Sequence, residues 1–148
     1  MYKKILVSVD GSDCSGEALK QAIGLARAFG SHVRLIHQIE EAHLQYSHES
    51  SGGPSATVEA VRERGRNLLS DALSVATAAG VDADTVLATD HAQLGKTIAT
   101  EASHWGAQLV VVGTSGRRGL ERFLVGSGAE QIIRETAAPV LVVKMPAH

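Results

Sequence analysis

Cysteine, net charge and long apolar runs are all scarce in this 148-residue chain. The one thiol, Cys14, cannot form an internal disulfide and has no evident base to activate it, which favours a reducing compartment over a redox role. A formal charge of -2 gives no overall field that would gather nucleic acid or an anionic membrane, so neither partner is expected. The apolar run after Lys3 and Lys4 stops at Ser8, too early for a signal peptide, and no run reaches membrane-spanning length. We therefore expect a cytoplasmic protein.

What the chain does have is the composition and pattern of a folded α/β domain. With 44% apolar and 20% charged residues, it can bury about two thirds of its unfolded surface. Short β-branched runs alternate with stretches of helical periodicity, which is typical of strand–helix–strand units around a parallel sheet. We predict a single domain, residues 1–148, in which helices cover both faces of an open five-stranded parallel sheet. The predicted strands are residues 5–9, 33–37, 84–88, 109–112 and 140–143.

A polar stretch, residues 40–56, follows the second predicted strand. It contains Gly52-Gly53-Pro54 and shows no periodicity, so we predict a long loop. His43 and His48 lie in this loop, but two histidines without a cysteine are a weak indication of metal binding, and no metal site is predicted there.

Two predicted strand ends carry residues suited to binding a ligand. In an open parallel sheet, ligands bind beside the carboxyl ends of strands, where the chain connections change direction. The first strand ends near Asp10, and the fourth runs into Gly113, with Gly116 after two residues and Gly126-Ser127 after nine more. Glycines let a ligand approach backbone N–H groups, and a helix beginning at Ser127 adds free donors and a positive dipole end. The expected anion is phosphate.

Each of these residues also has a purely structural explanation. Ser127 and Glu130 fit a capping box, and the glycines fit ordinary turns. A strand end, two spaced glycines and a helix-opening Gly-Ser arriving together favour binding. No role is assigned to three arginines of this loop, Arg117, Arg118 and Arg122.

Two other nucleotide-binding patterns are excluded. Gly95-Lys96-Thr97 matches the end of a Walker A loop, but the first glycine of that pattern would fall on Asp90, and Gly95 lies inside a predicted helix. The G-x-G-x-x-G fingerprint of Rossmann dehydrogenases is absent after the first strand, where the sequence is Asp10-Gly11-Ser12-Asp13.

The glycine pattern and both ends of the chain carry a family resemblance. The pattern is Gly113, two residues, Gly116, nine residues, Gly126 and Ser127; the chain opens with KKILVSVDGSDCSGEAL and closes with APVLVVK. In these stretches, and over essentially its whole length, the sequence resembles the ATP-binding branch of the universal stress protein superfamily. The resemblance implies the strand order 3-2-1-4-5, with Asp10 and Gly113 flanking one crevice.

The resemblance further implies an adenine nucleotide as ligand, either ATP or AMP or a relative, with Mg²⁺ as an optional companion through Asp13. Asp10 would lie at the adenosine end, Gln38 would meet adenine through its main chain, and the glycine motif would hold ribose and phosphates. No catalytic residue is expected. The implied nucleotide-binding residues are Ser8, Val9, Asp10, Gln38, Gly113, Gly116, Gly126, Ser127 and Gly128.

Two positions depart from the family pattern. Position 38 is usually small and apolar, whereas Gln38 brings a polar side chain that either adds a hydrogen bond or points to solvent. Position 128 is often valine, and Gly128 loosens the first turn of its helix, at a cost to phosphate binding of up to about 1 kcal/mol. Both changes leave affinity and nucleotide choice open.

The family typically forms dimers through its fifth strand, and an uncovered apolar edge strand promotes association. We therefore expect a homodimer through Val140 to Val143, acting on an unknown protein partner as a nucleotide-dependent regulatory or stress-response factor.

Three alternatives stay open. A weak ATPase or self-phosphorylating protein would need metal ligands, for which Asp10 and Asp13 are the only obvious candidates near the phosphate loop. A dimeric scaffold that binds no nucleotide is the second. A phosphorelay receiver, using Asp10, Asp13 and Lys144, is the third, but it has no adjacent acidic pair and leaves the glycine loop unexplained.

Overall fold

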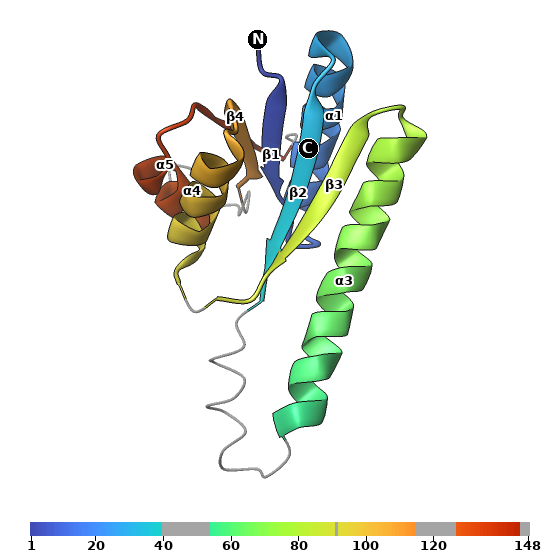
Figure 1. Ribbon diagram of the computed structural model, residues 1–148, viewed down its shortest axis with the longest axis vertical. Coiled ribbons are helices and arrows are strands. Elements are labelled where there is room, and N and C mark those ends of the chain that lie inside the picture. Colours follow the sequence, from blue (N-terminus) through green and yellow to red (C-terminus); the bar gives the residue numbers. More distant parts are fainter. Residues whose placement is uncertain (40–53, 91, 115–126, 146–148) are drawn as a thin grey trace.

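Five parallel strands form one sheet in the order β3-β2-β1-β4-β5 in the computed structural model (Figure 1). The structure describes residues 1–39, 54–90, 92–114 and 127–145. The predicted fold class and strand order are confirmed. The strands are β1 (Lys4–Ser8), β2 (His32–Gln38), β3 (Asp82–Ala88), β4 (Leu109–Gly113) and β5 (Val140–Val143).

Four described helices cover the two faces of this sheet (Figure 1). On one face, α1 and α3 pack over one apolar cluster, and on the other, α4 and α5 pack over a second. Helices on both faces are what a parallel sheet needs, because its strands are buried on both sides. The helices are α1 (Asp13–Phe29), α3 (Pro54–Ala78), α4 (Leu94–Trp105) and α5 (Ser127–Glu135).

The central strand β1 explains why its sequence is an unbroken apolar run. Ile5 and Val7 point into the cluster under α1 and α3, whereas Leu6 points into the cluster under α4 and α5, and all three are 0% exposed. A strand with solvent on one face would alternate apolar and polar residues instead.

Helix ends follow local capping rules. Ser12 caps α1, its hydroxyl accepting a hydrogen bond from the backbone N–H of Ser15 at 3.2 Å. Gly30 and Gly106 follow the last residues of α1 and α4 in the left-handed conformation, at φ 68° and 79°. These stops leave short connections at the amino-terminal edge of the sheet, where β2 and β4 begin.

The element boundaries differ slightly from the sequence expectation. The third strand begins at Asp82, two residues before the predicted start, because Asp82 and Asp84 pair in register with His32 and Arg34 of β2. Opposite charges across neighbouring strands stabilise a segment whose acidic residues argue against a strand in isolation. Helix α3 begins at Pro54, inside the predicted loop.

Candidate functional site

The chain reverses direction across the sheet between β1 and β4. From β1 the chain passes through α1 to β2 on one side, and from β4 it passes through α5 to β5 on the other. The carboxyl ends of β1 and β4 lie side by side, since Val7 pairs with Val111. A crevice at such a switch point is where open α/β sheets bind ligands.

Asp10 lies at this edge as predicted, and its carboxylate is held by the following turn. Its Oδ1 accepts hydrogen bonds from the backbone N–H of Ser12 at 2.9 Å and from the Ser12 hydroxyl at 2.5 Å. The backbone N–H of Asp10 donates to the Ser15 hydroxyl at 3.3 Å. The side chain of Asp10 is therefore exposed yet oriented before any ligand arrives.

Val9 is more deeply engaged than the sequence suggested. Its side chain is 4% exposed in the cluster under α1 and α3. Its N–H donates to the carbonyl of Ile36 at 2.9 Å, and its carbonyl accepts from His37 Nδ1 at 2.8 Å. A carbonyl can only accept, so Nδ1 of His37 carries the hydrogen. These two hydrogen bonds hold the chain just after β1 against the end of β2. Ser8, the last residue of β1, is half-buried.

Gly113 ends β4 directly against the first turn of α1. A β-carbon at this position would lie 2.6 Å from the carbonyl carbon of Cys14 and 3.1 Å from the backbone nitrogen of Ser15. Helix α1 therefore requires glycine here even without a ligand. The amino-terminal end of α1, with its positive dipole, is brought to the carboxyl end of β4 by this contact.

Gln38, the last residue of β2, does not simply point to solvent. Its Nε2, which has two hydrogens to donate, lies 2.9 Å from Asp90 Oδ1, 2.8 Å from the carbonyl oxygen of Ala92 and 2.9 Å from Thr97 Oγ1. Thr97 is 5% exposed, and its hydroxyl also donates to Asp90 Oδ1 at 2.9 Å. The side chain of Gln38 thus joins the end of β2 to the start of α4.

Two glycines let α4 and α5 approach closely beside the crevice. A β-carbon on Gly95 would lie 2.6 Å from Cβ of Gln131, and one on Gly128 would lie 3.2 Å from Cδ2 of Leu94. A side chain at position 128, where the resemblance had suggested valine, would therefore require the end of the Leu94 side chain to shift by a few tenths of an ångström. The first turn of α5, which the sequence associates with phosphate, therefore lies beside the start of α4.

Several predicted residues cannot be placed. Gly116, Gly126 and the side chain of Ser127 lie outside the described residues, as do the three arginines of the predicted loop. Asp13, the candidate Mg²⁺ ligand, is the exposed first residue of α1. Within the described ranges, no three or more His, Cys, Asp or Glu side chains group in a way that could hold a metal ion.

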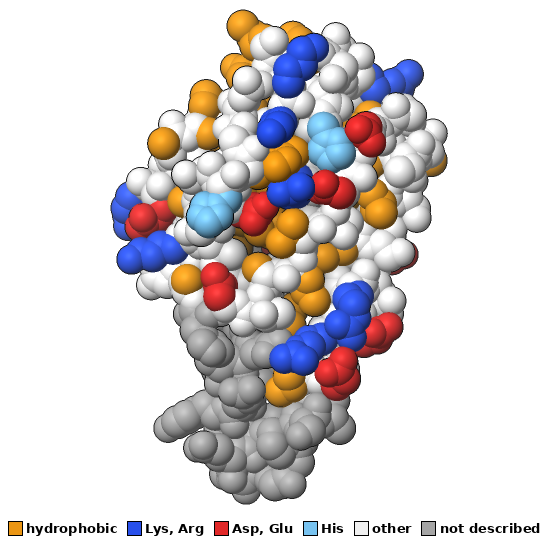
Figure 2. Space-filling view, viewed as in Figure 1, with side chains coloured by type: hydrophobic (Ala, Val, Ile, Leu, Met, Phe, Trp, Pro, Cys, Tyr) orange, Lys and Arg blue, Asp and Glu red, His pale blue; other side chains and the backbone are white. Residues whose placement is uncertain are grey.

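A charged cluster that sequence reasoning missed covers part of the sheet face beside α4. Arg34 binds Asp84 through Nε and Nη2 at 2.8 and 3.0 Å and Glu101 through Nη1 at 2.9 Å, and its Cζ lies 4.5 Å from the ring centre of Trp105. His32 reaches Asp84 at 3.2 Å. Figure 2 shows basic, acidic and histidine side chains gathered on this face. Alternation along β2, with His32 and Arg34 on one face, was the available signal.

These contacts change the acidity of the groups involved. Hydrogen bonds from the Arg34 guanidinium, helped by His32, hold the pKa of Asp84 below its ordinary range, although partial burial acts in the opposite direction. The same carboxylate raises the pKa of Arg34. Both shifts favour the charged forms of Arg34 and Asp84, and the cluster joins β2, β3 and α4.

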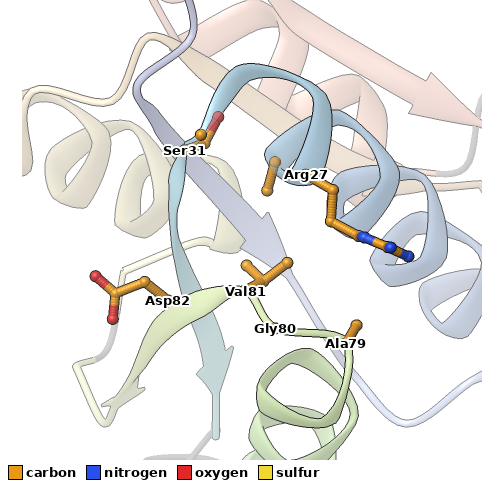
Figure 3. Close-up of a pocket in the computed structure, with 8 residues that line it drawn as sticks. Arg27, Ser31, Ala79, Gly80, Val81 and Asp82 are labelled. Carbon is orange, nitrogen blue, oxygen red and sulfur yellow. The ribbon is translucent and has the colours of Figure 1, made fainter.

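A pocket of about 370 Å³ lies at the opposite edge of the sheet from the switch point. Figure 3 shows Ser31, Val81 and Asp82 at the starts of β2 and β3, with Arg27 projecting from α1 and Gly80 at the end of α3. Both neighbouring helices end here, and none of the residues predicted to bind nucleotide lines it. It is separate from the candidate site.

Comparison with known proteins decides the family. The model of the universal stress protein family matches residues 1–144. The chain belongs to this family. A curated relative, the universal stress protein MJ0531 of Methanocaldococcus jannaschii, is 36% identical over 146 residues, covering 99% of this chain and 84% of the relative.

Solved structures of the family share the fold. Hypothetical protein MJ0577 superposes with a TM-score of 0.83 at 24% identity, covering 100% of this chain and 99% of the other. A universal stress protein from Archaeoglobus fulgidus, solved in complex with dAMP, superposes with a TM-score of 0.72 at 26% identity, covering 97% and 98%. In the described part of this chain, no helix combines the length and the apolar character needed to cross a membrane.

Proposed function

We propose that this universal stress protein binds an adenine nucleotide in the crevice between the ends of β1 and β4. The observation that carries the proposal is the presence of three features at one edge of the sheet: the oriented carboxylate of Asp10, the end of β4 at Gly113, and the first turn of α5, which lies near the start of α4. The Archaeoglobus relative in complex with dAMP supports an adenine nucleotide as the ligand class.

In the proposed arrangement, the phosphates and the base of the nucleotide each lie beside residues of complementary chemistry. Phosphates go to the start of α5, where free backbone N–H groups of Ser127 and Gly128 and a positive dipole end favour an anion. Gly116 and Gly126 give the backbone room around ribose and phosphates. Asp10 accepts from ribose or base, and Gln38 lies at the base end, with Ser8 and Val9 forming the strand end beneath.

Binding rather than catalysis is the proposed activity. Phosphoryl transfer requires metal ions held on the phosphates and a group that positions the nucleophile. Asp13 is exposed at the start of α1 and is the one candidate for an Mg²⁺ contact, while Oδ1 of Asp10 is already engaged with Ser12. Slow hydrolysis of ATP is the alternative, and loss of turnover in Asp13→Ala would distinguish it from a contaminant.

The proposed biological role is a dimeric regulator of stress response whose contacts with a protein partner depend on the bound nucleotide. β5 ends the sheet and consists of Val140, Leu141, Val142 and Val143, of which the first three are only partly buried. A second copy pairing along this edge would cover them and satisfy the backbone groups of the open strand.

Equilibrium dialysis of AMP and ATP, with and without Mg²⁺, tests the binding proposal. We expect saturable binding below millimolar nucleotide and at least a tenfold loss in Gly126→Val, because a branched side chain obstructs the backbone where phosphate is proposed to lie. Gly24→Ala, an exposed change in α1, is the control and should bind normally. Absence of binding at millimolar nucleotide by the unmodified chain would overturn the proposal.

A further inference from the structure

The carboxamide of Gln38 faces an unusual number of hydrogen-bond acceptors. Its Nε2 lies 2.9 Å from Asp90 Oδ1, 2.8 Å from the carbonyl of Ala92, 2.9 Å from Thr97 Oγ1 and 3.5 Å from the carbonyl of Asp90. One amide nitrogen has two hydrogens to share among these four oxygens. Oε1 accepts no hydrogen bond from any residue that the structure describes.

The neighbours determine which way round the amide sits. Two of them are backbone carbonyls and one is a carboxylate oxygen, all of which can only accept. The fourth, the hydroxyl of Thr97, gives its own hydrogen to Asp90. Rotating the amide by half a turn would place Oε1 against these oxygens, so that acceptor would face acceptor with no hydrogen between them, which is unfavourable. The network therefore leaves an acceptor, Oε1, as the unused polar atom of Gln38.

Gln38 ends β2, beside the switch point and on the sheet face that α4 and α5 cover. Ile36 of β2 packs in the cluster under α4 and α5, and Gln38, two residues later, is on the same face of the sheet as the start of α5. The order β2-β1-β4 separates Gln38 from the end of β4 by two strand spacings, about 10 Å. A mononucleotide lying in the crevice beside β1 and β4 would therefore be long enough to bring its base to Gln38.

We propose that Gln38, locked by Asp90 and Thr97, selects 6-amino purines over 6-oxo purines, an inference that rests on the proposed nucleotide function. The amino group of adenine is a donor and complements Oε1. The 6-oxo group of hypoxanthine or guanine is an acceptor and would face another acceptor without a hydrogen between them. Gln38 is then the specificity-determining residue, and Asp90 and Thr97 are positioning residues that prevent the amide from rotating.

The ratio of the affinities for AMP and IMP tests this directly, because the two nucleotides differ in the purine 6-position and its neighbouring N1 hydrogen. We expect the unmodified protein to bind AMP at least about tenfold more tightly than IMP, the effect of one mismatched polar pair. Gln38→Met, of similar length but without the acceptor, should bring the two affinities within about threefold. Gln93→Met is the matched control, since the exposed Gln93 makes no side-chain capping bond, and it should keep the ratio.

The positioning residues give a second arm that does not alter Gln38. Thr97→Val removes a partner of Nε2 and lets the amide rotate, so the AMP to IMP ratio should fall, whereas Thr97→Ser keeps the hydroxyl and should restore it. A structural role alone would lower the affinities for both nucleotides together and leave the ratio unchanged.

Three outcomes separate the two proposals. Equal binding of AMP and IMP by the unmodified protein, or an unchanged ratio in both Gln38→Met and Thr97→Val, overturns base selection and leaves nucleotide binding intact. Failure to bind either nucleotide overturns the proposed function itself.

Discussion

The carbonyl carbon of Cys14 lies 2.6 Å from the point that a β-carbon on Gly113 would occupy. Gly113 is therefore needed for the packing of α1 against the end of β4, whatever else it does. A substitution there would move the two walls of the proposed crevice apart. Loss of nucleotide binding in a Gly113 variant would not by itself show that Gly113 contacts the ligand.

Replacing Gly113 with alanine should destabilise the protein. The added carbon has backbone rather than a flexible side chain to displace, so we expect a loss of about 1–3 kcal/mol in the free energy of unfolding. Urea denaturation followed by circular dichroism measures this loss. Gly24→Ala adds the same single carbon at an exposed position in α1 and should stabilise by about 0.5–1 kcal/mol. Equal midpoints for Gly113→Ala and the unmodified chain would contradict the packing described here.

Gly95→Ala should weaken the contact between α4 and α5. Its β-carbon would approach both Cβ and the backbone of Gln131 within 2.6 to 2.7 Å, so α5 must shift, at about 1–3 kcal/mol. Gly16→Ala, in an exposed turn of α1 with no described atom nearby, is the control and should be neutral or stabilising. Chemical denaturation compares them, and a Gly95→Ala protein as stable as Gly16→Ala would refute close packing of the two helices.

Acid should destabilise the unmodified protein partly through Asp84. Its folded-state pKa is below the unfolded value of about 3.9, so its contribution is complete above that value and is lost as pH falls through the folded pKa. Asp84→Asn should therefore be less stable at neutral pH and lose less between pH 6 and about pH 2. Urea midpoints across this range measure the difference. The exposed Asp71→Asn should behave as the unmodified chain, and parallel curves for all three proteins would contradict the assignment.

The proposed dimer makes Val142 a sensitive position. The N–H groups of Val110 and Thr114 donate to the carbonyls of Pro139 and Val143, so alternation turns the backbone of Val142 toward the open edge. Val142→Pro removes an edge donor without removing a bond to β4, and should give a monomer in sedimentation with an unchanged circular dichroism spectrum. Val142→Thr keeps the N–H and should remain dimeric. A dimeric Val142→Pro protein would exclude pairing along β5.

The fold was predictable because the strands that are buried on both faces are nearly continuous runs of apolar residues. Uninterrupted apolar residues in β1 and β4 predict central strands, and their order follows once the family resemblance is recognised. The true start of β3 was not predicted, since Asp82 argues against a strand until His32 of β2 is known to lie beside it. The ion pair between Arg34 of β2 and Asp84 of β3 joins residues 50 positions apart, so no short stretch of the sequence indicates it.

The candidate site was predictable only in outline. The sequence identified Asp10 and Gly113 as two strand ends, but it could not separate ligand space from helix packing at Gly113, because both require a missing side chain. The sequence also could not decide whether the Gln38 side chain forms a hydrogen bond or points to solvent. Its partners Asp90 and Thr97 are 52 and 59 residues away, and only the packing of α4 against β2 brings them together.

The two edges of the sheet are chemically unlike. β5 is wholly aliphatic, whereas β3 carries Asp82 and Asp84, both engaged with side chains of β2. A chain with two adhesive edges could add copies end to end without limit and grow into a fibre. If copies pair through β5 as proposed, the aliphatic edge is covered in both copies, and the acidic residues of β3 disfavour further addition, so the assembly would close at two copies.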